Sequence, residues 1–253
     1  MKPLAPRVLA AIAACVVALS CGGVPTFVDG IAFISTLQRP SLAIAALDTL
    51  RDSLGRVTPL RVYAFGQGDD TIRGVTASFL VTTLPAGVNI DANGIVTAFD
   101  SLRTVQIVAR IGDRLQTQPA NLDVVAQPDQ MVSSGTVDSL ALVTPSSPLQ
   151  VTITGNRKGT RVPVNGIVVR YAVVATVPAG PIADSLFVFT EGVRGALTTA
   201  VDTTRDGGIT SRTLIATDLA SGIRTVVVRA TAKNLKGAPF APVEFVIPLK
   251  KGS

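Results

Sequence analysis

Two-residue alternation of apolar and polar side chains is the feature that most limits the fold of this chain. Between Thr104 and Ile111 the odd-numbered positions are apolar, whereas Gln106 and Arg110 are polar. The run Thr225–Ala232 repeats the pattern, with apolar residues at its even-numbered positions. Successive side chains of a strand point to opposite faces of a sheet, so this alternation is typical of half-buried strands. We therefore expect sheets that bury one face.

The composition also favours strands over helices. Hydrophobic residues make up 47 % of the 253 residues and charged residues only 16 %, which is typical of a globular chain rather than a disordered one. Glutamate occurs only at Glu191 and Glu244, while 22 glycines and 16 prolines separate the apolar segments. Valine, isoleucine and threonine favour strands, and glycine and proline favour turns. The sequence therefore predicts an all-β fold.

Candidate strands after residue 30 fall into two groups. In the first group, Asp91–Gly94 is expected to form a turn, because Asp and Asn side chains bond their own backbone and Gly accepts a positive φ. The candidate strands of this group are Ile31–Leu37, Leu42–Leu50, Leu60–Phe65, Val75–Thr83, Thr104–Ile111 and Asn121–Ala126. Those of the second group are Val137–Val143, Leu149–Thr154, Ile167–Ala175, Leu186–Thr190, Thr198–Asp202, Gly208–Thr217, Thr225–Ala232 and Val243–Pro248.

Between the two groups, residues 127–135 have the Gln, Pro, Asp, Ser and Gly content of a linker. Short strands at this spacing, with turn residues between them, indicate β-sandwiches. We therefore expect one sandwich over residues 31–126, a second over residues 136–249, and a solvated tail at residues 250–253.

A weak internal repeat links the two groups and carries a family resemblance. Gly94-Ile95 is echoed by Gly208-Ile209, and residues 103–109 are echoed by residues 224–230. The run Asp91–Ala98, followed by Val105–Ala109, resembles the end of bacterial immunoglobulin-like domains. Residues 206–211, followed by residues 225–230, resemble the invasin and intimin variant, although the chain lacks the tryptophan often found in that family. The resemblance implies two immunoglobulin-like β-sandwiches in tandem, of the kind that serve as stalks and binding modules in adhesins, and no catalytic residue.

The amino-terminal segment has the layout of a secretory signal peptide. Lys2 and Arg7 precede the uncharged apolar residues 8–19, a run shorter than the roughly 20 residues of a membrane-spanning helix. The tetrad Ala18-Leu19-Ser20-Cys21 resembles the lipobox of bacterial lipoproteins, in which the chain is cut before the cysteine. The alternative is an ordinary signal peptide in which Cys21 is incidental.

The lipobox resemblance implies that residues 1–20 are removed and that Cys21 carries acyl chains such as palmitate. Residues 21–30 would then be a spacer on the membrane side. Cys15 is the only other cysteine and would leave with the signal peptide, so lipidation explains the one that remains. Gly22 replaces the Asp that retains many lipoproteins in the inner membrane, which favours the outer membrane. The expected location is therefore the cell envelope, with the membrane as a partner through Cys21.

The sequence offers little catalytic chemistry. It contains no histidine, no GxGxxG or GxxxxGK[ST] loop and no Ser-x-x-Lys, which removes the usual triads, proton shuttles and nucleotide sites. We therefore predict no catalytic residue, no cofactor and no metal site. Carboxylates at Asp69-Asp70, Asp91 and Asp202 with Asp206 are candidate Ca²⁺ ligands, but a turn role is favoured for Asp91. The formal charge of +6 is dispersed and only 4 % of residues are aromatic, which argues against nucleic acid.

The leading functional hypothesis is a non-enzymatic envelope lipoprotein. It would present its two domains to another envelope protein as a spacer, scaffold or adhesin-like module. The alternative is a carboxylate-based hydrolase or carbohydrate-binding protein, which would need two carboxyl groups about 5–10 Å apart in a cleft. A third is assembly into a larger envelope complex. The aromatic residues Tyr63, Tyr171, Phe187 and Phe189 are expected in the core rather than in a sugar site.

Overall fold

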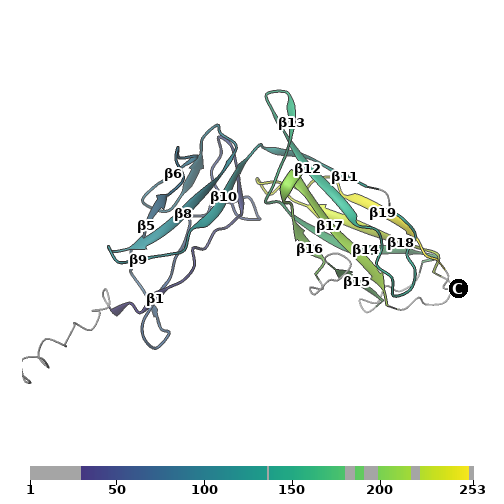
Figure 1. Cartoon of the computed structure of the whole chain (residues 1–253), viewed down its shortest axis with the longest axis horizontal. Helices are drawn as coiled ribbons and strands as arrows, with labels where there is room; N and C mark the ends of the chain where they lie inside the picture. Colours follow the sequence, from purple (N-terminus) through teal and green to yellow (C-terminus); the bar gives the residue numbers. More distant parts are fainter. Residues whose placement is uncertain (1–29, 136, 180–185, 191–198, 218–222, 251–253) are drawn as a thin grey trace, which may run out of the picture.

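The computed structural model describes residues 30–135, 137–179, 186–190, 199–217 and 223–250, which form two β-sheet units joined end to end (Figure 1). Throughout these ranges the regular structure is β, apart from short 3-10 turns such as Asp206–Gly208. None of the helical turns in these ranges is long and apolar enough to cross a membrane. The prediction of an all-β chain is confirmed.

The first unit is built on one larger sheet. Its central strands β8 and β10 are antiparallel, β5 adds to the free side of β8, and β2 runs parallel to β10. The strands of this sheet are β2 (Ala43–Ala45), β5 (Ser78–Val81), β8 (Arg103–Ile111), β9 (Leu115–Gln116) and β10 (Ala120–Val125). Two small sheets complete the unit: β1 (Phe33–Ile34), β3 (Ala64–Phe65) and β4 (Thr71–Ile72), and β6 (Val88–Ile90) with β7 (Val96–Ala98).

The second unit is a sandwich of two sheets. One has the order β11-β12-β17-β15, with β13 paired to β12, and the other has the order β16-β14-β18-β19. The strands of the first sheet are β11 (Pro128–Ser133), β12 (Leu149–Arg157), β13 (Thr160–Pro163), β15 (Phe187–Thr190) and β17 (Ile209–Ala216). Those of the second are β14 (Val168–Val177), β16 (Val201–Thr203), β18 (Thr225–Ala232) and β19 (Val243–Pro248).

The strand order identifies the type of sandwich. In the second unit β11, β12 and β17 take the places of strands A, B and E of an immunoglobulin-like domain, while β14, β18 and β19 take those of C, F and G. In the first unit β5, β8 and β10 likewise follow the order C, F, G. The expectation of tandem immunoglobulin-like sandwiches is therefore confirmed.

The cores follow the alternation seen in the sequence. Both alternating runs became the central strand of a sheet, β8 in the first unit and β18 in the second. Val105, Ile107 and Ala109 of β8 are fully buried, as are Val226, Val228 and Ala230 of β18. Burying one such apolar side chain contributes about 1.5–3 kcal/mol, so each run anchors its own core.

The repeated Gly-Ile pair meets the same packing requirement in both units. Gly94 has φ +80° and ends the Asp91 turn, in which Asp91 Oδ1 accepts hydrogen bonds from the amides of Asn93 and Ile95. A β-carbon on Gly94 would lie 3.0 Å from the Leu60 carbonyl oxygen. Gly208 has φ +69°, and its β-carbon would lie 2.4 Å from the Ile153 carbonyl oxygen. Each glycine thus lets a turn lie directly on the backbone of a neighbouring segment.

The expected linker over residues 127–135 is a strand for most of its length. β11 spans Pro128–Ser133, pairs with β12 and places Met131 in the core at 7 % exposure. Only two residues separate β10 from β11. β11 is an edge strand with solvent-facing polar residues, which explains why its composition resembles that of a linker.

Two further differences concern strand positions. The expected strand Val137–Val143 forms only isolated parallel bridges, from Leu140 to Leu249 and from Leu142 to Ala216. The hairpin strand β13 was not expected, because Thr160–Pro163 lacks an apolar run. Local pattern did not reveal these two pairings, which depend on partners elsewhere in the sandwich.

Candidate functional site

The two units meet through loops that approach backbone to backbone. A β-carbon on Gly55 would lie 2.1 Å from the Lys236 carbonyl oxygen, and one on Gly237 would lie 2.7 Å from the Leu54 carbonyl oxygen. A β-carbon on Gly166 would lie 2.6 Å from that of Ala43. All three glycines have φ near +80°, which glycine adopts readily. A side chain at any of them would push the units apart.

Apolar packing continues across this junction. Ala43, Val125 and Ala126 of the first unit belong to the hydrophobic core of the second. Asp100 of the first unit also lies 3.3 Å from Arg157 Nη2 and 3.8 Å from Lys158 Nζ. Such partly exposed pairs contribute at most about 1 kcal/mol each, so the apolar contact and the glycine approach hold the junction. The two sandwiches are therefore directly packed, not strung on a flexible link.

Replacing Gly55 with alanine tests this junction. We expect the units to separate or reorient, since the new methyl group would overlap the Lys236 carbonyl oxygen. Small-angle X-ray scattering would then show a changed radius of gyration. Gly74→Ala is the matched control, because Gly74 also has positive φ but has no atom within 4 Å of its β-carbon position. Identical scattering from both variants would contradict a junction held by close backbone contact.

A groove of about 510 Å³ runs along the junction, and we call it the inter-unit groove. Residues 39–42 and 51–53 of the first unit form one wall, and the start of β14 with the loop after β18 forms the other. Its lining combines exposed apolar side chains, such as Leu42 and Val168, with the cations Arg39, Arg51, Arg170 and Lys233. Pockets of this size at domain junctions are common ligand sites.

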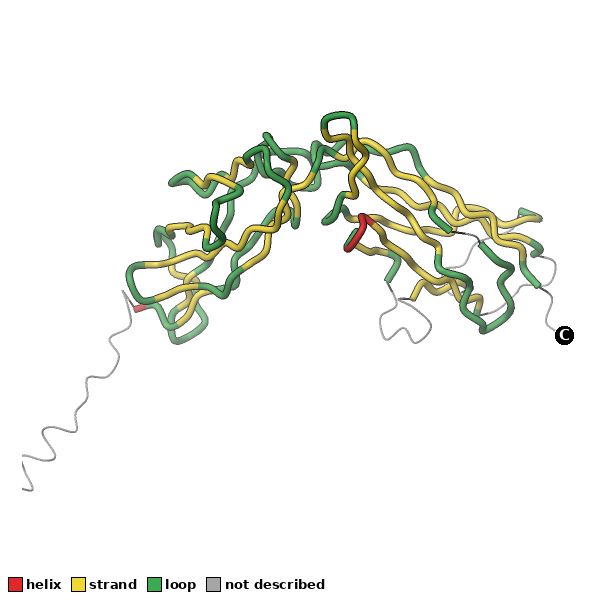
Figure 2. Tube along the Cα trace, turned by 45° about the horizontal axis from the view of Figure 1, so that its top comes forward, coloured by secondary structure: helices red, strands yellow, loops and turns green. Residues whose placement is uncertain are grey.

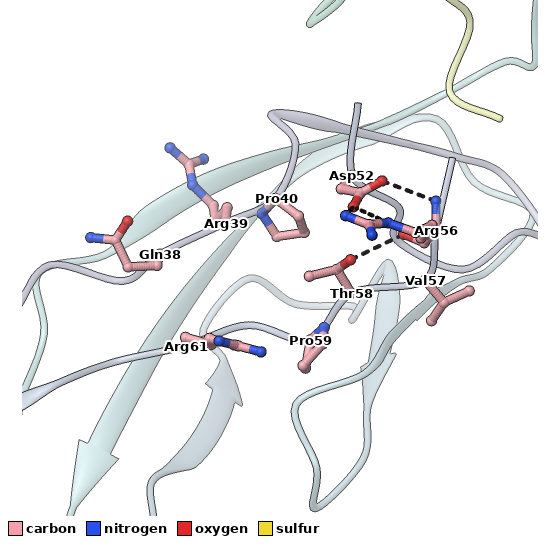
Figure 3. A pocket seen from close by; sticks show the side chains of 9 residues that line it. All are labelled: Gln38, Arg39, Pro40, Asp52, Arg56, Val57, Thr58, Pro59 and Arg61. Atoms are coloured by element: carbon pink, nitrogen blue, oxygen red, sulfur yellow. Dashed lines mark hydrogen bonds and ion pairs between the residues drawn. The ribbon is translucent and has the colours of Figure 1, made fainter. Parts of the chain in front are cut away.

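A second hollow of about 530 Å³ adjoins the groove, and we call it the arginine hollow (Figure 3). It is lined by Gln38, Arg39, Pro40, Asp52, Arg56, Val57, Thr58, Pro59 and Arg61. Three of these residues, Arg39, Pro40 and Asp52, also line the inter-unit groove. The two hollows therefore adjoin at these three residues, and we refer to them together as the recess.

Asp52 is the only carboxylate among the described residues that line either hollow. Its Oδ2 accepts hydrogen bonds from Nε and Nη2 of Arg56 at 3.0 and 2.9 Å, which are among the dashed contacts of Figure 3. The amide and side chain of Arg56 and the amide of Leu54 lower the pKa of Asp52. A carboxylate held ionised in this way shapes the loop and is a poor general acid.

A largely buried ion pair lies inside the second unit. Arg212 of β17 and Asp202 of β16 form an ion pair with a distance of 3.0 Å, and their side chains are 4 % and 12 % exposed. Asp202 also accepts hydrogen bonds from Thr210 Oγ1 at 2.7 Å and from the amides of Ser211 and Thr203. The Arg212 guanidinium donates further to the carbonyl oxygens of Thr199, Val201 and Ser211. This network ties β16 to β17 across the sandwich.

The electrostatics of Asp202 follow from these contacts. Burial alone would raise the pKa of Asp202, but the hydrogen bonds from Thr210, Ser211 and Thr203 and the charge of Arg212 lower it overall. Burial raises the pKa of the neighbouring Tyr171 hydroxyl, so that group stays protonated. Asp202 is thus an ionised structural carboxylate.

The Ca²⁺ candidates find no support in this arrangement. Asp202 forms an ion pair with Arg212. The described residues contain no group of three or more His, Cys, Asp or Glu side chains that could hold a metal ion. Asp91 makes the turn that the sequence predicts. Asp69 has φ +61° in the turn between β3 and β4, where the amide of Gly66 donates to the Asp70 carbonyl oxygen.

The aromatic residues divide between core and surface. Tyr171 and Phe187 are buried, and Phe189 packs against Tyr171 with ring centroids 6.3 Å apart, as expected. The expectation for Tyr63 was wrong, because its side chain is 42 % exposed. Phe33, also exposed, stacks on Phe65 at 4.9 Å. Phe33 and Phe65 lie on the short strands β1 and β3, and Tyr63 directly precedes β3. These strands are too short to show an alternating pattern that would reveal the buried face.

The lipidation candidate Cys21 lies outside the described residues. Neither hollow was apparent in the sequence. The walls of the inter-unit groove come from loops of both units that meet only at the junction, and the arginine hollow is formed by loop residues between Gln38 and Arg61.

Comparison with known proteins gives only distant likenesses. No protein-family model matches the sequence, and no curated protein matches it. The Yersinia pseudotuberculosis adhesin InvE has a TM-score of 0.35 and 16 % identity over 88 % of this chain and 61 % of its own. Domains 4 and 5 of the S-layer protein SbsC score 0.33 with 14 % identity, covering 87 % of this chain and all of theirs. The D0-D1 domain of intimin scores 0.24 with 13 % identity, covering 84 % and 98 %. Values this low establish neither a family nor a function.

Proposed function

We propose that this chain is a non-enzymatic lipoprotein of the cell envelope that presents two directly packed immunoglobulin-like sandwiches to another protein. The observation that carries the proposal is the junction. Gly55, Gly166 and Gly237 bring the units into backbone contact, and Val125 and Ala126 continue the apolar core across it. A pair of sandwiches fixed in this way can hold a binding surface at a set distance from its anchor.

The direction of the chain fits an anchor at its beginning. Figure 1 shows β1 at the end of the first unit remote from the second, and the β10–β11 connection at the other end. A chain tethered through Cys21 would therefore enter at the far end of the first unit. The junction lies at the opposite end of the first unit, and the second unit continues from it at an angle (Figure 2).

The alternative of a carboxylate-based hydrolase gains no support from the recess. Hydrolysis of a glycoside uses two carboxyl groups facing one bond. Asp52 is the only carboxylate along the described lining of the two hollows, and Arg56 binds it. The lining of the recess therefore favours a binding function.

Cys21→Ser tests the anchor. We expect the wild-type chain in the membrane fraction, with acyl chains on Cys21 as its first residue, because several chains on one residue hold a protein firmly. The variant should lose the acyl mass and leave the membrane fraction almost completely. Cys15→Ser is the control and should behave as wild type. Mass spectrometry of the mature amino terminus decides the question, and an unlipidated wild-type protein would contradict the anchor.

A further inference from the structure

We propose that the inter-unit groove and the adjoining arginine hollow bind an extended acidic segment of a protein partner. The inference deepens the proposed protein-binding function and rests on it. Its basis is the set of charges and apolar side chains that line the recess.

The charge of the recess is strongly unbalanced. Its lining holds Arg39, Arg51, Arg56, Arg61, Arg170 and Lys233 against the single carboxylate of Asp52. Two of these cations are already neutralised, Arg56 by Asp52 and Arg51 by Asp48 at 3.1 Å. Arg61, Arg170 and Lys233 also line the recess, and no ion pair or side-chain hydrogen bond within the described residues compensates their charges. A hollow lined by one sign of charge concentrates the opposite sign.

Arg39 stands where the two hollows meet and is partly withdrawn from water. Burial lowers the pKa of its guanidinium, and the charge of Asp123 opposes this shift only in part. Arginine stays protonated in proteins, so the group remains a cation with incomplete hydration. An incoming carboxylate would restore the lost interactions with bidentate hydrogen bonds.

The apolar lining indicates a peptide rather than a small anion. Leu42 and Val168 are 44 % and 53 % exposed, and Pro40, Leu235 and Pro239 lie beside them. Alternate side chains of an extended peptide point in opposite directions, so acidic and apolar residues could meet the cations and the apolar wall in turn. Neither hollow has a Phe, Tyr or Trp among the described residues lining it, which disfavours a nucleic acid strand, since such strands stack on aromatics.

The test uses the purified full chain and a fluorescein-labelled octapeptide of alternating glutamate and leucine, followed by fluorescence anisotropy. We expect saturable binding that weakens as salt is raised from about 0.05 to 0.5 M. Arg170→Ala/Lys233→Ala should weaken binding about tenfold, since each exposed charge contributes up to about 1 kcal/mol. Both side chains are exposed, so the fold should persist, which thermal unfolding checks.

The matched control is Arg73→Ala/Arg114→Ala, which removes two exposed arginines that line neither hollow and should leave binding unchanged. The same peptide with lysine for glutamate should not bind. Absence of saturable binding, equal weakening by the control variant, or equal binding of the lysine peptide would overturn the proposal.

Two further probes separate other occupants. One probe is polygalacturonate and the other is vesicles of phosphatidylglycerol. If either binds as tightly as the peptide, and Arg170→Ala/Lys233→Ala weakens that binding equally, the recess binds a polysaccharide or a lipid surface. That result would overturn the proposal of an acidic peptide. The peptide could show no binding while Cys21 is acylated and Gly55→Ala changes the scattering. That result would contradict only the assignment of the groove, and the proposal of an anchored two-domain module would be retained.

Discussion

Replacing Arg212 with alanine is expected to lower the free energy of unfolding by about 3–5 kcal/mol, the largest effect of any substitution considered for this chain. The change removes the partner of Asp202, whose side chain is only 12 % exposed, and leaves a buried carboxylate without its countercharge. It also leaves the carbonyl oxygens of Thr199 and Val201 without the guanidinium donors. Urea unfolding followed by far-ultraviolet circular dichroism would measure the loss.

Arg229→Ala is the matched control within the same unit. Arg229 pairs with Glu244 at 2.7 Å, a shorter distance than that of the Arg212 pair, but both side chains are nearly half exposed. Solvent screens such a pair, so we expect a loss below about 1 kcal/mol. Equal losses of unfolding free energy in the two variants would contradict the view that burial, and not contact distance, determines how much each ion pair stabilises the fold.

The Arg212 network also predicts the sign of a pH effect. The pKa of Asp202 is lowered from its ordinary value of 3.8, so its contribution to stability is fully present above about pH 4. That contribution is lost as the pH falls through the lower pKa of the folded state. In Arg212→Ala the carboxylate keeps its burial but loses the cation, so the advantage of ionisation shrinks and acidification should cost this variant less stability than wild type. Unfolding curves between about pH 3 and 7 would show the difference.

A second variant, Asp202→Ala/Arg212→Leu, separates the effect of the unpaired Asp202 charge from that of the lost guanidinium hydrogen bonds. Removing both charges leaves no uncompensated ion, and such replacements are often nearly neutral. We therefore expect the double variant to recover most of the stability lost in Arg212→Ala. A double variant as unstable as the single one would show that the hydrogen bonds lost from the Arg212 guanidinium to Thr199 and Val201, and not the unpaired charge of Asp202, carry the effect.

Gly208→Ala is expected to lower the free energy of unfolding by about 3 kcal/mol or more. A positive φ costs a non-glycine residue about 1–2 kcal/mol. At Gly208 the new β-carbon would also lie 2.4 Å from the Ile153 carbonyl oxygen and 2.8 Å from the Val164 amide, both backbone atoms of the same sheet region. β12 would have to move away from the turn, which also disturbs its pairing with β17.

Gly159→Ala separates the strain of a positive φ from the steric overlap of the new β-carbon with neighbouring backbone atoms. Gly159 has φ +85° in the hairpin between β12 and β13, but no atom lies within 4 Å of its β-carbon position. This variant should show the conformational strain alone, about 1–2 kcal/mol. Chemical denaturation of both variants gives the difference, and equal losses would mean that the close approach to Ile153 is relieved without cost.

The parts of the fold that the sequence predicts are those set by local alternation. β18 and β19 begin and end at the predicted residues, because Thr225–Ala232 and Val243–Pro248 alternate cleanly between turn residues. The Asp91 turn was predictable for the same reason, since its hydrogen bonds lie within five residues.

Features that depend on distant partners could not be predicted in this way. The residues of β11 have the composition of a linker, but in the structure they pair with β12 and bury Met131 in the core. In the sequence Asp202 has the features of a free metal ligand. In the structure it forms an ion pair with Arg212, which lies ten positions further along the chain. The recess arises only where Arg39 and Lys233, almost two hundred positions apart, line one groove. Residue types reveal such features only when the register of the whole sandwich is known.

The parallel pairing of β2 with β10 has a mechanical consequence. Ala43, Ile44 and Ala45 lie opposite Asp123, Val124 and Val125, and the amino-terminal end of β2 and the carboxyl end of β10 point in opposite directions. A pull applied between the chain's beginning and its second unit would therefore shear this ladder, straining its hydrogen bonds together instead of peeling them one at a time. We therefore expect the first unit to resist a pull applied in this direction.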